Sequence, residues 1–253
     1  MPRDEYRADL DALRSAISAY GADVREQFDD GLRALERGDE ELARAVIEAD
    51  EAINDRYLAL ESDCIDLLAL QQPVASDLRF VASSFKIVTD LERVGDLATN
   101  LGTYALADDR RLDAAVDLRG IGAVVDEMLE TALDAYAADD AAACRAVADR
   151  DDEVDALCER ASQRIVRELI ARAATPDGDV EAVDEAGAIS ADSTGASDGA
   201  GDLAIDGWSV ERLLDDVSRV LLAIRDLERV GDHAVNIAAR TLYTADNDTS
   251  LLY

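Results

Sequence analysis

The sequence predicts an all-α protein built from two copies of a three-helix unit. Large apolar residues recur at steps of three or four along most of the 253-residue chain, which is the period of an amphipathic helix. No stretch shows the strict apolar–polar alternation of a half-buried strand, and glycine and proline are sparse outside one segment. A long stretch of the chain also repeats. Together these observations predict six long helices in two tandem bundles.

Three consecutive runs of apolar residues define the first unit. The spacing predicts one helix over about residues 17–35, a second over about 42–68, and a third over about 78–94. Pro73 is expected to mark the turn between the second and third helices, because proline starts helices well and breaks them when it lies inside.

The second unit repeats these runs. A shift of 101 residues aligns DEAIN at 50–54 with DDEVD at 151–155, and a shift of 136 aligns DLERVGD at 90–96 with the identical heptapeptide at 226–232. The shifts differ by 136 − 101 = 35 residues, which is close to the length of the acidic segment at about 174–207. We therefore expect an insertion before the last helix of the second unit.

The inserted segment differs in composition from the rest of the chain. It holds six of the 14 glycines and no basic residue, which is typical of an acidic flexible linker. The predicted division is a first unit at 1–108 and a second unit at 109–253 that is interrupted by this linker.

Each unit carries two polar pairs at i,i+4 spacing, so the members of a pair share one helix face. The pairs are Asp50 with Asn54, Glu92 with Asp96, Asp151 with Asp155, and Glu228 with Asp232. With a turn near 72–73, both pairs of the first unit lie at the same height on antiparallel helices. Carboxylates this close repel by about 0.2–0.5 kcal/mol per exposed pair, and by more when clustered. The repeated arrangement favours a bound cation, with an exposed acidic face as the alternative.

Oxygen ligands limit the choice of cation. Without thiolate or paired imidazole ligands, the predicted metals are Mg²⁺, Mn²⁺, Ca²⁺ or iron.

Gly95 and Gly231 lie inside helices, where glycine costs about 1 kcal/mol relative to alanine. They allow either the approach of a metal or partner, or close helix packing. Asn100 and Asn236 extend the polar face and are expected to make interhelical or second-shell hydrogen bonds.

Arg93 and Arg229 occupy the same place in the two heptapeptides. The predicted partners are Asp90 and Asp226 on the same helices, as counter-ions of the acidic face, in preference to phosphate or a partner protein. His233 has no counterpart in the first unit, and we interpret it as a surface or packing residue rather than a metal ligand.

The charge of the chain excludes several classes of function. Asp and Glu number 57 against 25 Lys and Arg, which gives a net charge of −32. Such a polyanion repels nucleic acid and anionic lipid. Asp outnumbers Glu 39 to 18, and Lys86 is the only lysine beside 24 arginines, which is typical of proteins from salt-accumulating, halophilic cells. Most of the acid is therefore interpreted as a solvated surface.

Cysteine and histidine content limits the chemistry further. Cys64, Cys144 and Cys158 form no CxxC pair, which fits a reducing cytoplasm, and a single histidine excludes HExxH sites. No apolar run has the length of a membrane span, and the N-terminal residues lack the apolar core of a signal peptide. We expect a cytoplasmic protein without direct membrane insertion.

The segment QQPVASDLRFVASSFKIVTDLERVGDLATNL and its second copy RDLERVGDHAVNIA resemble the PhoU family of phosphate-uptake regulators. The resemblance implies two three-helix bundles with E(D)xxxD motifs that bind multinuclear iron or zinc clusters. These motifs correspond to Glu92 with Asp96, Glu228 with Asp232, and, on the second helices, Asp50, Asp151 and Asp155. Asn54 departs from the pattern, because that motif usually ends in an acid, and an amide oxygen is expected to ligate more weakly.

The resemblance also implies a function and partners. PhoU-like proteins are regulatory accessory proteins rather than enzymes. They act with the phosphate-specific ABC transporter, restrain uptake when phosphate is plentiful, often work with a phosphate-sensing histidine kinase, and tend to form homodimers. Membrane association would then run through the cytoplasmic side of the transporter. The alternatives are a carboxylate-bridged metalloenzyme in a helical bundle, and an accessory scaffold of another transporter.

Overall fold

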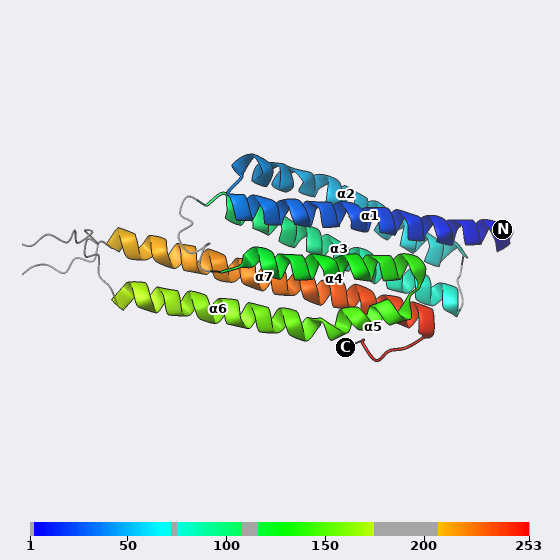
Figure 1. Cartoon of the computed structure of the whole chain (residues 1–253). Coiled ribbons are helices and arrows are strands. Elements are labelled where there is room, and N and C mark those ends of the chain that lie inside the picture. The colour runs from blue at the N-terminus through cyan, green and yellow to red at the C-terminus, as the bar shows by residue number, and fades with distance from the viewer. Residues whose placement is uncertain (1–2, 72–74, 108–115, 175–206, 253) are drawn as a thin grey trace, which may run out of the picture.

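The computed structural model describes residues 3–71, 75–107, 116–174 and 207–252, and these residues form an elongated helical bundle (Figure 1). Seven helices occur in the described ranges, without any strand: α1 (Arg3–Arg37), α2 (Glu40–Gln71), α3 (Ser76–Ala105), α4 (Leu118–Ala138), α5 (Ala141–Asp149), α6 (Asp151–Ala174) and α7 (Gly207–Asp246). The all-α prediction is confirmed. When α5 and α6 are counted as one interrupted helix, the six predicted helices are all present.

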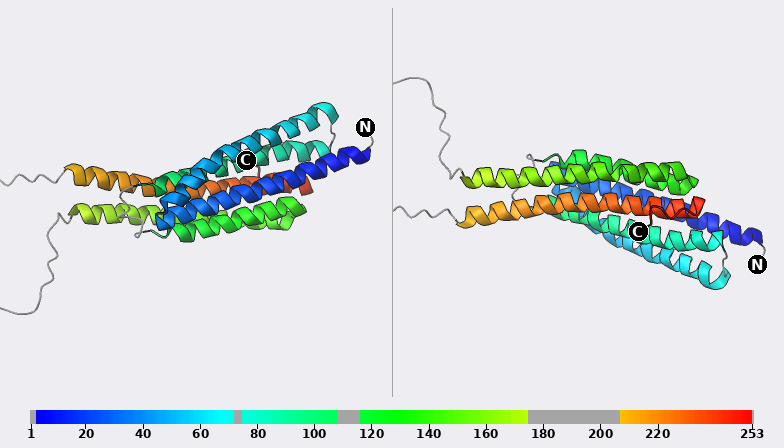
Figure 2. Two further views of the ribbon diagram at one scale, coloured as in Figure 1. Left: turned by 90° about the horizontal axis from the view of Figure 1, so that it is seen from above. Right: turned by 90° about the horizontal axis from the view of Figure 1, so that it is seen from below.

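The two repeated units meet along their last helices. In the first unit α3 packs against α1 and α2, and in the second unit α7 packs against α4, α5 and α6. The same two helices, α3 and α7, pack against each other, and α1 packs against α4. Figure 2 shows α3 and α7 in the middle of the bundle from both sides. The identical heptapeptides therefore lie at the interface between the units.

Each heptapeptide has an apolar side and a charged side. Leu91 and Val94 on α3 and their equivalents Leu227 and Val230 on α7 are fully buried. Burying side chains of this size contributes about 1.5–3 kcal/mol each. The acidic and basic residues between them face outward or lie half-buried, so the packing of the helices determines where the repeated carboxylates are presented.

The expected second helix of the second unit is interrupted at Arg150, which corrects the prediction of a continuous helix. The backbone N–H of Arg150 donates to Val147 O at 3.1 Å, a tighter turn than the α-helical one. Residues 151–153 are all acidic, and acidic side chains favour the positive end of a new helix dipole. The Arg150 guanidinium also contacts Glu127 on α4 at 3.1 Å. In the first unit Ala49 stands at the equivalent position, and α2 continues through it.

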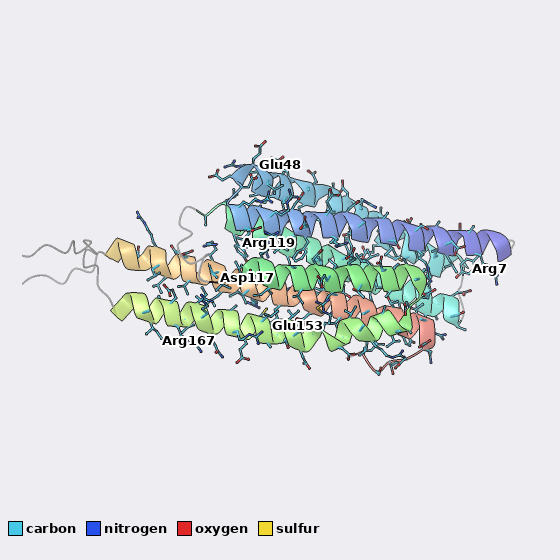
Figure 3. The ribbon with its side chains drawn as sticks, viewed as in Figure 1. Arg7, Glu48, Asp117, Arg119, Glu153 and Arg167 are labelled. Carbon is cyan, nitrogen blue, oxygen red and sulfur yellow. The ribbon has the colours of Figure 1, made fainter. Side chains whose placement is uncertain are left out.

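Charged side chains cover the outside of the bundle, as Figure 3 shows for Glu48 on α2 and Arg167 on α6. The three cysteines are buried and unpaired. None of the described helices is long and apolar enough to span a bilayer. The turn predicted at Pro73 falls outside the described residues, between the end of α2 and the start of α3. Apart from Ala174 and Gly207, the predicted linker at 174–207 also falls outside them.

Candidate functional site

The first carboxylate cluster consists of Asp50 on α2 and Glu92 and Asp96 on α3. Thr99 Oγ1 on α3 donates to Asp50 Oδ1 at 3.0 Å, so Asp50 lies level with a residue about one helical turn beyond Asp96. Asn54 Nδ2 donates to the other oxygen of Asp50 at 2.9 Å. Burial raises the pKa of both Glu92 and Asp96; the charge of Asp96 and then that of Asp50 add to the effect at Glu92, and the charge of Asp50 adds to it at Asp96.

The second carboxylate cluster consists of Asp151 and Asp155 on α6 and Glu228 and Asp232 on α7. Burial raises the pKa of Asp151 to about 6, and the charges of Asp155, Asp232 and Glu228 contribute. Burial and the charge of Asp155 also raise the pKa of Glu228 and of Asp232. The structure therefore places all four predicted carboxylates within electrostatic reach of one another across two helices.

The two heptapeptide glycines allow α3 and α7 to approach their neighbours closely. A Cβ atom added at Gly95 would lie 3.0 Å from Ile53 Cγ2, and one added at Gly231 would lie 3.5 Å from Val154 Cγ1. Ile53 and Val154 occupy equivalent positions in the two units. Of the two interpretations of these glycines, the contacts favour close helix packing.

Gln27 on α1 lies behind the first cluster and is not among the predicted site residues. Its side chain is 5% exposed, and its Nε2 donates to Thr99 Oγ1 at 3.2 Å and to Val46 O at 3.3 Å. Its Oε1 has no hydrogen-bond partner among the described residues and would lie 3.3 Å from a Cβ at Gly95. A glutamine on the otherwise apolar face of α1 is the sequence signal that could have identified this residue.

Tyr20 on α1 is a second buried polar side chain near the first cluster. Its hydroxyl has no hydrogen-bond partner in the described part of the chain. Burial raises its pKa well above the usual value, and the charges of Glu92 and Asp96 raise it further. In the second unit Ile121 and Met128 stand where Tyr20 and Gln27 stand in the first. The first cluster therefore has two neutral oxygen atoms behind it, and the second has apolar side chains.

Hydrogen bonds between α3 and α7 join the two units. His233 Nδ1 lies 2.9 Å from Asp90 Oδ1, and both side chains are buried. Around the equivalent Asp226, Tyr104 OH donates to Oδ2 at 2.8 Å and Asn100 Nδ2 donates to it at 3.1 Å. The interhelical hydrogen bond expected of Asn100 is confirmed, and His233 is a packing residue that also makes a specific polar contact.

The expected intrahelical pairing of Arg93 and Arg229 is wrong. Asp90 and Asp226 lie in the α3–α7 interface, where they make hydrogen bonds with His233 and Tyr104, respectively. Both arginines are exposed. Neither arginine makes an ion pair within 4.0 Å of a described carboxylate. Asn236 is exposed as well and, among the described residues, makes no hydrogen bond, so the bond expected of it is absent there.

The side chains fit a cation by their donor chemistry and charge. Carboxylates from two helices lie within electrostatic reach of one another in each cluster, and a positive ion would relieve their mutual repulsion. Tyr20 and Gln27 add unpaired oxygen atoms beside the first cluster. Within the described residues, no three His, Cys, Asp or Glu side chains already converge around one point in a way that would hold a metal. Binding a metal therefore requires side-chain movement.

Comparison with known proteins identifies relatives of the whole chain. The PhoU domain model matches residues 17–105, 118–207 and 203–241. A phosphate-specific transport system accessory protein PhoU homolog of Pseudomonas putida is 33% identical over 242 residues, which cover 94% of this chain and 80% of the relative.

Solved structures show the same arrangement. The crystal structure of PhoU from Pseudomonas aeruginosa is 30% identical and gives a TM-score of 0.74 over 96% of this chain and all of that one. The phosphate transport system regulatory protein PhoU from Streptococcus pneumoniae, 25% identical, gives a TM-score of 0.75 over 96% of this chain and 98% of that one.

Proposed function

The chain belongs to the PhoU family, and we propose that it is a regulatory accessory protein of phosphate uptake that holds metal ions in its two carboxylate clusters. In this proposal it restrains a phosphate-specific ABC transporter when phosphate is plentiful. The observation that carries the metal-binding part is the repetition of mutually repelling carboxylates at equivalent places in both units. The transport role is supported by the names of its relatives.

Asp151, Asp155, Glu228 and Asp232 would hold the metal of the second cluster. Asp50, Glu92 and Asp96 would hold that of the first, with the amide oxygen of Asn54 as a weaker ligand. The resemblance to PhoU proteins favours iron or zinc, and the oxygen ligands alone also suit Mg²⁺, Mn²⁺ or Ca²⁺. A bound cation would supply positive charge between the two helices of a unit and so link α2 to α3, or α6 to α7.

The two clusters are not chemically equivalent. Both oxygen atoms of Asp50 already accept hydrogen bonds, from Thr99 and Asn54. At the position equivalent to Thr99 the second unit has Val235, and it has Asp155 in place of Asn54. The second cluster therefore has more negative charge and fewer compensating donors. We infer that it binds a cation more tightly than the first.

The partners follow from the same proposal. The protein would contact the cytoplasmic ATPase side of the transporter, would be peripheral to the membrane only through it, and would act as a homodimer. A phosphate-sensing kinase is a second partner in this scheme. The polyanionic surface remains unsuited to nucleic acid.

Deleting the gene and measuring phosphate uptake in phosphate-rich medium tests the function. We expect uptake to stay high where the parent strain reduces it, and the wild-type gene to restore control. Complementation with Glu228→Gln/Asp232→Asn is expected to fail. A charge-matched control, Glu48→Gln/Glu51→Gln on the exposed face of α2, is expected to succeed.

Several results would contradict the proposal. Normal uptake and normal phosphate-responsive expression in the deletion strain would contradict a role of the protein in phosphate control. A change confined to the uptake of another solute would assign the protein to a different transporter. Metal-dependent oxidase or phosphatase turnover by the pure protein would favour the metalloenzyme alternative.

A further inference from the structure

A cavity of about 250 Å³ lies between α3 and α7, beside the first carboxylate cluster. Its lining residues are Arg93, Asp96, Leu97, Thr99 and Asn100 from α3 and Arg229 from α7. The cavity is thus formed by both units, at the interface where Figure 1 shows α3 and α7 running side by side. Its polar lining suits a charged ligand rather than an apolar one.

Two guanidinium groups, one from each unit, give this cavity its chemical character. Arg93 and Arg229 are the equivalent arginines of the two heptapeptides, and neither is bonded to a described carboxylate. Some other arginines of the chain form ion pairs: Arg25, for example, binds Asp126 at 2.8 Å and Glu130 at 2.7 Å. Two equivalent arginines and a single carboxylate, Asp96, line the cavity, so its charged side chains carry a net positive charge that suits an anionic ligand.

The size and lining of the cavity narrow the class of anion. The volume of about 250 Å³ lies just below the ~300–1,000 Å³ of sites for drug-sized ligands. It has room for a small tetrahedral oxyanion with some water. Asn100 has a second amide N–H beside the one that donates to Asp226, and so adds a neutral donor.

Asp96 is the one carboxylate in the lining of the cavity. Its carboxylate lines the cavity and repels a fully ionised anion such as sulfate. Hydrogen phosphate carries a P–OH group at neutral pH, and that group donates a hydrogen bond to a carboxylate oxygen while the other oxygens accept from the arginines. A carboxylate beside two arginines therefore favours a protonated oxyanion.

We propose that this cavity is a binding site for inorganic phosphate, held by Arg93 and Arg229 and selected by Asp96. The inference rests on the proposed function and deepens it, because it supplies a place where the protein itself detects phosphate. One arginine comes from each unit, so an occupied site ties the two units together. Asp96 also belongs to the first carboxylate cluster, and a cation there reduces the repulsion of the anion. By linkage, phosphate then strengthens the binding of that cation equally.

Equilibrium dialysis with radiolabelled phosphate in concentrated potassium chloride tests the proposal on the full chain. The protein is used both as purified and after treatment with a chelator. We expect saturable phosphate binding in at least the untreated protein. Arg93→Gln and Arg229→Gln are each expected to weaken it about tenfold, because each removes charge-assisted hydrogen bonds. Arg164→Gln, which removes the same single charge from the exposed face of α6, is the matched control and should bind as the wild type does.

Competition measurements establish the class of ligand. Unlabelled phosphate should displace the label, while sulfate and ATP should require at least about tenfold higher concentrations. Arg93→Lys keeps the charge and should bind better than Arg93→Gln. Circular dichroism on every variant confirms that it is folded before binding is compared.

Three results would overturn the proposal: no phosphate binding with or without chelator, binding unchanged in both arginine-to-glutamine variants, or displacement by sulfate or ATP as efficient as by phosphate. These failures are separable from failure of the proposed function. Loss of uptake control in the deletion strain without phosphate binding by the protein rejects only the phosphate site. Phosphate binding with normal uptake in the deletion strain rejects the regulatory role.

Discussion

Exchanging Asn54 and Asp155 between the two clusters gives a quantitative test of how hydrogen bonding and carboxylate repulsion set the stability of each cluster. Asn54→Asp removes the 2.9 Å hydrogen bond to Asp50, which contributes about 0.5–1.5 kcal/mol for a bond of this kind. It also introduces an i,i+4 carboxylate repulsion of about 0.2–0.5 kcal/mol. The metal-free protein should therefore lose about 1–2 kcal/mol of unfolding free energy. For a chain of this size that corresponds to a fall of roughly 2–8 °C in Tm.

Thermal unfolding is followed by circular dichroism with chelator and with added metal. It measures the stability of the metal-free protein and the stabilisation that metal adds. Asn54→Asp should unfold earlier than the wild type in chelator but gain more from metal, because a carboxylate binds a cation more strongly than an amide does. The matched variant Asp155→Asn should behave oppositely, with a higher Tm in chelator and a smaller gain from metal. A rise in the metal-free Tm of Asn54→Asp, or an equal response of all three proteins to metal, would refute this reasoning.

Three further predictions concern stability and are checked by urea unfolding. Because the pKa of Asp151 is raised from 3.8 to about 6, protonation favours the fold, so the metal-free protein should become more stable as the pH falls from about 7.5 to about 5. Gly231→Ala should stabilise α7 by up to about 1 kcal/mol, whereas Gly95→Ala should gain less or lose stability, because its Cβ would meet Ile53 at 3.0 Å. His233→Leu should cost about 1–3 kcal/mol, because Asp90 loses its buried partner.

Each of these predictions has a control and a contradicting outcome. The pH effect should shrink in Asp151→Asn, and stability that falls steadily toward about pH 5 would oppose it. Equal effects of the two glycine substitutions would show that the contact with Ile53 does not matter. Asn236→Leu, at an exposed position one turn beyond His233, should leave the free energy of unfolding nearly unchanged. A loss equal to that of His233→Leu would show that the contact with Asp90 does not stabilise the fold.

Most of the fold follows from local pattern and internal repetition. The helix period and the heptapeptide shared by α3 and α7 predict two equivalent bundles, because both are properties of the chain itself. The interruption at Arg150 was not predicted, since it depends on the adjacent acidic run and on a contact with Glu127 from α4. The apolar residues keep the helical period through this region, so the sequence pattern does not reveal the tighter turn at Arg150.

The candidate site divides in the same way. The carboxylate pairs were predictable because i,i+4 spacing fixes a common helix face. The contacts of Gln27 and Tyr20 and the Asp90–His233 bond were not predictable, because each depends on how one helix is rotated against another. Arg93 was assigned the wrong partner for the same reason: sequence distance favours Asp90, but packing turns that carboxylate away into the interface between the units.

The metal content of the purified protein tests the central claim most directly. Elemental analysis of the wild type should find bound iron, zinc or another divalent metal. Glu228→Gln/Asp232→Asn should lose the larger part of it and Glu92→Gln/Asp96→Asn the smaller part, while Glu48→Gln/Glu51→Gln should lose none. Metal content that is the same in all four proteins, or absent from the wild type even after metal is supplied, would contradict the assignment of the two carboxylate clusters.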